Sequence, residues 1–169
     1  MDIFIINNKN LNHVPPEILN DFGQKLFKNR EKELIHQFSY LMIDRILKEV
    51  YKIENRSLVT KENGKPELEN QDKYLSISHS GEYIVLGFSD SKCGIDIEKI
   101  KPRNYKKISE KMGFKSSSLE EFYLNWTKYE AEYKLDGESK STYKFSIPNY
   151  IITAVSENEK ELFNTYYSN

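Results

Sequence analysis

Cysteine is almost absent from this sequence of 169 residues, and long apolar runs are missing altogether. The single cysteine, Cys93, excludes a disulfide within the chain and fits a reducing compartment. No stretch approaches the roughly 18 apolar residues that a membrane helix needs. The apolar stretch at the amino end carries Asp2 and is too short for a secretory signal. We therefore expect a cytoplasmic protein without a membrane partner.

The sequence also lacks an excess of charge of either sign. Lys and Arg number 25 against 26 Asp and Glu, which gives a formal net charge of −1. A protein that binds the phosphate backbone normally carries a clear basic excess, so nucleic acid is not expected as a partner. The composition, with 38% hydrophobic and 30% charged residues, is ordinary for a soluble protein. The length is close to one domain of ~100–200 residues.

Hydrophobic periodicity predicts a mixture of helices and strands. The expected helices run from Pro15-Pro16 to about Phe27, from Glu31 to Tyr51, over Tyr105–Met112, and over Leu119–Leu135 after a cap at Ser116–Ser118. The expected strands are residues 2–7, a meander of Tyr74–Ser78, Tyr83–Phe88 and Cys93–Glu98, and a hairpin of Thr142–Ile147 and Tyr150–Val155. No pattern places Ser156–Asn169. The expected class is α+β, with two helix-plus-sheet halves, 1–100 and 101–169, that meet near Lys99–Arg103.

Three carboxylates and a lysine form the first group of candidate site residues. Side chains alternate along a strand, so Asp96 and Glu98 are expected to share one side of theirs. Glu130 and Lys134 are spaced i, i+4 and share one stripe of a predicted helix. Each pair also has an ordinary structural interpretation, as surface acids on a strand or as an exposed helix ion pair. Taken together, the three acids could bind Mg²⁺, which prefers carboxylate, water and phosphate oxygens.

A second group of residues could bind an anion. His79 lies between two serines and ahead of a glycine, where hydroxyl and imidazole groups can converge. Lys65 lies in a Gly-Lys-Pro turn and offers an ammonium. A structural histidine and a surface lysine are the alternative interpretations. With Ser78 and Lys134, these residues could hold phosphate oxygens that a metal leaves uncovered.

Four segments, in their order along the chain, resemble the motifs of 4'-phosphopantetheinyl transferases of the surfactin-synthetase-activating type. That family carries a Gly-Lys-Pro turn, Ile-Ser-His-Ser, Gly-Ile/Val-Asp-x-Glu, and Trp-x-x-Lys-Glu-Ala-x-x-Lys. The corresponding segments here are Gly64-Lys65-Pro66, Ile77-Ser78-His79-Ser80, Gly94-Ile95-Asp96-Ile97-Glu98 and Trp126–Lys134. The resemblance extends from about Arg30 to Val155. It implies a pseudo-dimer of two similar α+β halves with coenzyme A in the cleft between them.

The resemblance also implies an activity and a role for each matching residue. The activity is the transfer of the phosphopantetheine arm of coenzyme A to a serine of an apo acyl or peptidyl carrier protein, which releases adenosine 3',5'-bisphosphate. Asp96, Glu98 and Glu130 would bind Mg²⁺, and Lys134 would contact the phosphate under attack. Ser78 and His79 would hold coenzyme A phosphates, with Lys65 and Pro66 at the nucleotide end. Glu130 is the candidate base, either directly or through a metal-bound water.

The sequence departs from the family pattern at several positions. Tyr129 stands where the family has Lys, and Ser76 where it usually has Asn. The stretch between Glu98 and Trp126, which helps to form the carrier-facing surface in the family, is shorter than usual. Basic residues for the 3'-phosphate of coenzyme A have no one-to-one match, although Lys28, Arg30 and Lys32 have the right charge.

Two other functions are compatible with parts of the pattern. A degenerate relative could bind coenzyme A or a carrier protein without catalysis, which would explain Tyr129 and the short second half. A metal nuclease is disfavoured, because Ile100 stands where an acid-x-lysine motif needs Lys, and because the charge lacks a basic excess. A chain that forms a complete cleft from its own two halves is expected to be a monomer.

Overall fold

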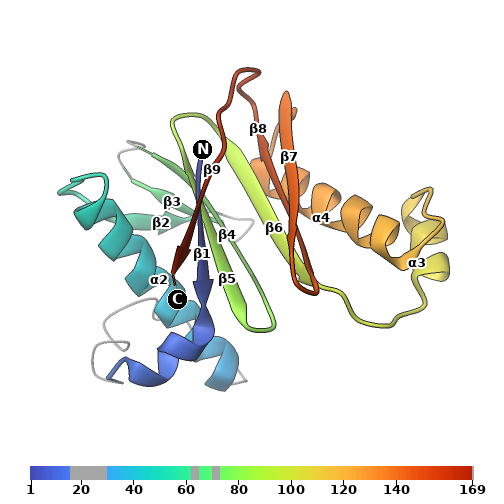
Figure 1. The fold of residues 1–169 in the computed structure, drawn as a ribbon. Coiled ribbons are helices and arrows are strands. Elements are labelled where there is room, and N and C mark those ends of the chain that lie inside the picture. The colour runs from blue at the N-terminus through green and yellow to red at the C-terminus, as the bar shows by residue number, and fades with distance from the viewer. Residues whose placement is uncertain (16–29, 62–64, 70–72, 169) are drawn as a thin grey trace.

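The computed structural model describes residues 1–15, 30–61, 65–69 and 73–168 (Figure 1). Helices and strands mix along the chain, which confirms the α+β class. The helical elements are η1 (Asn8–His13), α2 (Arg30–Glu49), α3 (Tyr105–Met112) and α4 (Leu119–Leu135). The strands are β1 (Asp2–Asn7), β2 (Leu58–Thr60), β3 (Pro66–Leu68), β4 (Tyr74–Ser80), β5 (Tyr83–Ser89), β6 (Cys93–Lys99), β7 (Ser141–Ile147), β8 (Tyr150–Ser156) and β9 (Asn164–Ser168).

The strands of the described residues form two larger sheets and one ribbon. The first sheet has the order β4-β5-β1-β9, the second has the order β6-β8-β7, and β2 pairs with β3 alone. All neighbours in the two larger sheets are antiparallel except β1 and β9, which are parallel. The chain therefore ends beside the strand with which it begins, as Figure 1 shows.

The predicted meander is wrong in its last strand. β4 and β5 pair as an antiparallel hairpin, but β6 pairs with β8 and not with β5. The reason is that β1 already occupies the second edge of β5. Residues 90–92 instead carry the chain from the first sheet into the second.

The core is arranged as helix, sheet, sheet and helix, in that order across the molecule (Figure 1). Strand β1 shows the alternation, because Ile6 packs with the α2 side chains while Ile3 and Ile5 pack against the second sheet. The α2 layer includes Phe38, Leu47, Leu86 and Phe88, and the layer between the sheets includes Val85, Cys93, Ile95, Ile97 and Ile152. On its other face, the second sheet packs against α4 through Val155, Ala131 and Leu135.

Some expectations fall outside what the structure tests. The helix expected from Pro15-Pro16 to Phe27 lies almost wholly outside the described residues, as does Gly64. β6 belongs by sequence to the first predicted half and β9 to the second, yet each pairs with strands of the other half. The division near residue 100 and the pseudo-symmetry of the halves stay predictions. Among the described residues, no helix is both long and apolar enough to cross a membrane.

Candidate functional site at the junction of β4, β6 and α4

The site begins with a close approach between β6 and α4. A Cβ atom placed on Gly94 would lie 1.9 Å from the carbonyl oxygen of Ala131, so a side chain at this position would collide with the helix backbone. Because Gly94 and Asp96 lie on the same side of β6, the helix residues on either side of Ala131 come to lie over Asp96. Glu130 and Lys134 are thereby brought to the strand that carries the other acids.

Asp96 is the most buried acid of the site, with 5% of its surface exposed. Its Oδ1 atom accepts hydrogen bonds from the Ser78 hydroxyl at 2.7 Å and from the Lys134 ammonium at 2.7 Å. Its Oδ2 atom is also buried and has no hydrogen-bond partner among the described residues. A buried carboxylate oxygen normally has a partner, so this atom is suited to a ligand.

Glu98 and Glu130 lie close enough to Asp96 to feel its charge. Burial raises the pKa of Glu98 above its usual value, and the charge of Asp96 raises it further, while a hydrogen bond from Ser80 lowers it. Burial and then Asp96 likewise raise the pKa of Glu130, while Lys134 lowers it. The charge of Asp96 therefore disfavours the ionised form of both other predicted ligands.

The donor set fits a magnesium ion that is shared with a substrate. Among the residues that the structure describes, no three His, Cys, Asp or Glu side chains are grouped closely enough to hold a metal by themselves. Mg²⁺ commonly uses only one or two carboxylates and completes its shell with water and substrate phosphate. The unpartnered Oδ2 atom of Asp96, with the neighbouring acids, matches this open kind of site.

A cavity of about 190 Å³ joins the predicted nucleotide-binding residues to the helix. Its lining comprises Lys65, Pro66, Ser76, Ile77, Glu130, Tyr133 and Lys134. Lys65 donates from its ammonium to the carbonyl of Cys93 at 3.2 Å, and loss of solvation lowers its pKa. Lys134 donates to the carbonyl of Ile95 at 3.1 Å. Four predicted site residues from distant parts of the sequence thus line one cavity, whereas Ser78, His79, Asp96 and Glu98 are not part of its lining.

Ser78 and His79 do not point the same way. Ser78 faces β6 and donates its hydroxyl proton to Asp96. His79, the next residue of the strand, projects to the opposite side, where part of its surface is exposed and part is shielded from water. Loss of solvation, and after it the charges of Lys134 and Lys32, lower the pKa of His79. The structure thus brings Lys32 into the electrostatic surroundings of His79, whereas Lys28 lies outside the described residues.

A second hollow, of about 310 Å³, has Glu98 in its lining. The other lining residues are Lys99, Lys101, Pro102, Arg103 and Tyr123. The guanidinium carbon of Arg103 lies 5.4 Å from the centre of the Phe122 ring and 5.7 Å from that of Tyr123. Stacking of this kind helps to hold the charge in place. Glu98 therefore lies at the boundary between the acidic site and this basic hollow.

Comparison with known proteins finds two curated relatives that match part of the chain. No family model matches the chain. Over 93 residues, or 48% of the chain, it is 32% identical to the 4'-phosphopantetheinyl transferase Sfp of Bacillus subtilis, of which the match covers 42%. Over 65 residues, or 37% of the chain, it is 35% identical to the 4'-phosphopantetheinyl transferase psf-1 of Bacillus pumilus, of which the match covers 28%. The resemblance to phosphopantetheinyl transferases is confirmed. In each case the match spans less than half of the relative's length.

The structure gives surroundings to Tyr129, which the sequence singled out, and to Tyr133 and Ser80, which it did not. Tyr129 lies against aromatic rings, with centroids 6.0 Å from Phe114 and 6.3 Å from Trp126. Tyr133, with 62% of its surface exposed, forms part of the cavity wall. Ser80 donates to Glu98 Oε2 at 3.1 Å. The signal for Ser80 was its spacing of two from Ser78, which places both hydroxyls on the side of β4 that faces β6.

Proposed function

We propose that this protein transfers the 4'-phosphopantetheine arm of coenzyme A to a serine of an apo acyl or peptidyl carrier protein, with Mg²⁺ as cofactor. The observation that carries the proposal is the buried, unpartnered Oδ2 atom of Asp96, whose other carboxylate oxygen accepts from the Lys134 ammonium. Lys134 in turn borders a cavity that Lys65 and Pro66 also line. This combination offers a cation site and phosphate-binding ammonium groups together. The names of both curated relatives agree with it.

The reaction needs a nucleophile, a base and stabilisation of charge on phosphate. The oxygen of the carrier serine would form a bond to the phosphorus that bears the pantetheine arm. The bond from that phosphorus to the bridging oxygen would break, and adenosine 3',5'-bisphosphate would leave with the electron pair. Mg²⁺, for which Asp96, Glu98 and Glu130 are the candidate ligands beside water and substrate phosphate, would neutralise charge on the pyrophosphate when bound.

Side chains of this protein would accept the serine proton and bind the phosphates. Glu130 is the proposed base for the serine proton, either directly or through a metal-bound water. The Lys134 ammonium would lie against the phosphate under attack, because it already borders the cavity. Lys65 would contact the nucleotide end from the cavity wall, and His79 would contact a phosphate from the other side of β4.

The basic hollow beside Glu98 is the proposed approach for the carrier protein. Lys99, Lys101 and Arg103 present positive charge next to the acid site. An acidic face on the carrier would complement these charges and bring its serine towards Glu130. In the cell, we expect the reaction to take place in the cytoplasm.

A mass measurement on carrier proteins tests the proposal. Apo acyl and peptidyl carriers, incubated with coenzyme A, Mg²⁺ and this protein, should gain the mass of the phosphopantetheine arm. Asp96→Ala and Glu130→Ala should each lower the rate by at least about 100-fold while leaving the fold intact. Glu132→Gln is the matched control on α4, because Glu132 bonds to Ser139 rather than to the site.

Binding without catalysis is the second candidate, and Tyr129 favours it. The position that carries Lys in the family holds a ring packed on Phe114 and Trp126. Calorimetry that detects coenzyme A binding, with no mass gain on any carrier of the panel, would establish this alternative in place of transfer.

A further inference from the structure

A row of serine hydroxyls connects the two sheets of the protein. Ser76, Ser78 and Ser80 lie at alternate positions of β4 and face the open edge of β6. The backbone N–H groups of Ile95, Ile97 and Lys99 donate to these hydroxyls at 3.0, 3.4 and 3.0 Å, respectively. Each partner lies 19 residues further along the chain. The constant offset means that the two strands run parallel, with side-chain hydroxyls in place of a backbone ladder.

The edge of β6 would otherwise present unpaired backbone groups. Its other edge pairs with β8, so the N–H and C=O groups on the β4 side have no strand neighbour. The hydroxyl row takes the N–H groups, while the ammonium groups of Lys65 and Lys134 take the carbonyls of Cys93 and Ile95. An unpaired buried backbone group is costly, so this set of contacts fixes how β6 lies against β4.

The same hydroxyls also hold the site carboxylates. Ser78 donates to Asp96 and accepts from Ile97, while Ser80 donates to Glu98 and accepts from Lys99. One hydroxyl thus bridges the side chain of one β6 residue and the backbone N–H of the next. Ser76 makes the backbone contact but, among the described residues, has no carboxylate partner. Ser76 and Ser80 therefore differ in one respect, since only Ser80 also bonds to a carboxylate.

We propose that Ser80 is a positioning residue that holds the Glu98 carboxylate in the orientation in which it shares a divalent cation with Asp96. Asp96 is already fixed by two contacts, from Ser78 and from Lys134. Glu98 is longer and less buried, and it accepts side-chain hydrogen bonds from Ser80 on β4 and from Trp126 on α4. Of the two, Ser80 also bonds to the β6 backbone, so it ties the carboxylate to the strand that carries Asp96. Groups that orient metal ligands normally determine much of the metal affinity. The inference rests on the metal site of the proposed function, but not on transfer itself.

The test is a titration of Mn²⁺ alone into the full chain. Binding is measured by calorimetry or from the electron paramagnetic resonance signal of free Mn²⁺. Wild-type protein should bind Mn²⁺, and Ser80→Ala should weaken binding by about tenfold. Ser80→Thr, which keeps the hydroxyl on a residue suited to a strand, should restore most of the affinity. Ser76→Ala is the matched control, because it removes a hydroxyl of the same row that holds no carboxylate. It should lower the Mn²⁺ affinity less than Ser80→Ala does.

A double variant tests whether Ser80 acts through Glu98. In a Glu98→Gln background, Ser80→Ala should cause no further loss of Mn²⁺ affinity. Thermal unfolding of each variant reports any general loss of structure. Equal losses for Ser76→Ala and Ser80→Ala, no loss for Ser80→Ala, or no Mn²⁺ binding by wild-type protein would each overturn the proposal. A protein that binds Mn²⁺ as described but modifies no carrier would refute the proposed transfer and leave the role of Ser80 intact.

Discussion

At the scale of single residues, the site combines groups that destabilise one another in the absence of a cation. Asp96 is buried with one oxygen unpartnered, and its charge raises the pKa of both Glu98 and Glu130. Lys134 compensates only part of this charge, through a single oxygen of Asp96. Stability and function compete at such a position, so removal of one acid should strengthen the metal-free fold.

We predict that Glu98→Gln raises the melting temperature of the metal-free protein at pH 7. The folded protein holds Glu98 with a raised pKa, so the ionised carboxylate costs stability above that pKa. This cost shrinks as the pH falls from the raised pKa of the folded protein to the ordinary value of 4.5. Below 4.5, Glu98 is protonated in both the folded and the unfolded protein, and the cost is gone. The gain should be about 2 °C at pH 7, since the carboxylate is still partly in water.

Differential scanning calorimetry of both proteins between pH 7 and pH 4, in the presence of a chelator, measures this difference. The stabilisation by Glu98→Gln should shrink as the pH falls. A difference that grows on acidification would contradict the raised pKa. Excess Mg²⁺ should stabilise wild-type protein more than the variant, because only the wild type keeps all three carboxylates.

At the scale of elements, local signals predict helices well and sheet membership poorly. The predicted bounds of α3 and α4 are confirmed, because each helix has a cap next to it in the sequence: the Asn104 side chain accepts from Lys107 N, and that of Ser118 from Glu121 N. β9 was not predicted, since its residues are mostly exposed and show no clear alternation. Its position depends on pairing with β1 at the other end of the chain.

At the site, too, features that depend on local sequence are predicted, whereas features that depend on strand pairing are not. The motif resemblance predicts that Lys65, Glu130 and Lys134 share a cavity, and the structure brings them together. It does not predict that Ser78 faces Asp96 while His79 faces away. That difference depends on which sheet β6 joins, and no residue between 89 and 93 specifies it locally. Roles in metal binding and catalysis stay predictions until they are measured.

The contact of α4 with β6 provides a prediction at this scale. Gly94→Ala should place a methyl group against the backbone of Ala131, where a Cβ atom would be 1.9 Å from the carbonyl oxygen. The helix must then move away from β6, which carries Glu130 and Lys134 away from Asp96. We expect a loss of about 1–3 kcal/mol in the free energy of unfolding. The loss of transfer activity should exceed what the unfolded fraction explains.

Urea denaturation and the carrier mass assay, performed on the same preparations, measure both effects. Gly137→Ala is the matched control, because nothing lies within 4 Å of a Cβ atom placed there. It should change stability by no more than about 0.5 kcal/mol and leave activity unaltered. Full activity of Gly94→Ala would show that α4 need not lie this close to β6.

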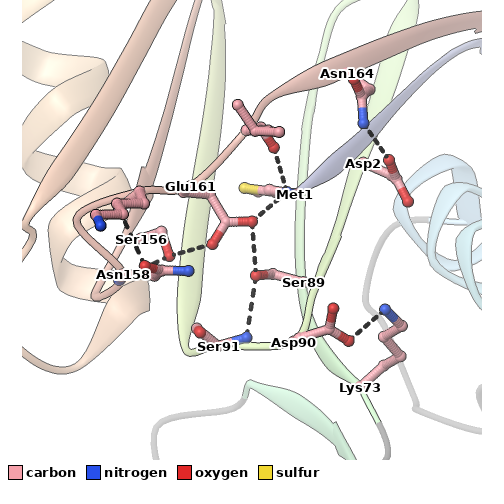
Figure 2. Close-up of polar contacts among 12 residues, drawn as sticks. Met1, Asp2, Lys73, Ser89, Asp90, Ser91, Ser156, Asn158, Glu161 and Asn164 are labelled. Atoms are coloured by element: carbon pink, nitrogen blue, oxygen red, sulfur yellow. Dashed lines mark hydrogen bonds and ion pairs between the residues drawn. The ribbon is translucent and has the colours of Figure 1, made fainter.

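At the scale of the whole molecule, Glu161 contacts residues of both larger sheets and the first residue of the chain. Glu161 pairs with the α-ammonium of Met1 and accepts hydrogen bonds from Ser89 at 3.1 Å and Ser156 at 2.9 Å (Figure 2). Met1 directly precedes β1, and Ser89 and Ser156 are the last residues of β5 and β8. Asn164 of β9 adds a bond to Asp2 at 3.0 Å. The network lies where the first and second sheets meet the returning chain.

We predict that Glu161→Ala lowers the free energy of unfolding by about 3 kcal/mol, the usual cost of leaving one partner of a buried ion pair alone. The side chains of Met1 and Glu161 are 0% and 7% exposed, so solvent replaces the lost contacts only in part. The nearby Lys73–Asp90 pair is the control, since Asp90 is 86% exposed (Figure 2). Asp90→Asn should change stability by no more than about 0.5 kcal/mol.

Urea denaturation at low and high salt separates the two cases further. The contribution of Glu161 should persist at 1 M salt, because water and ions do not reach a buried pair, whereas any effect of Asp90 should vanish. Hydrogen exchange should show β9 and the start of β1 opening together in Glu161→Ala, since both lose the same anchor. If β9 exchanged freely while β1 stayed protected, β9 would be an independent addition to the first sheet, and Glu161 would not unite the two ends of the chain.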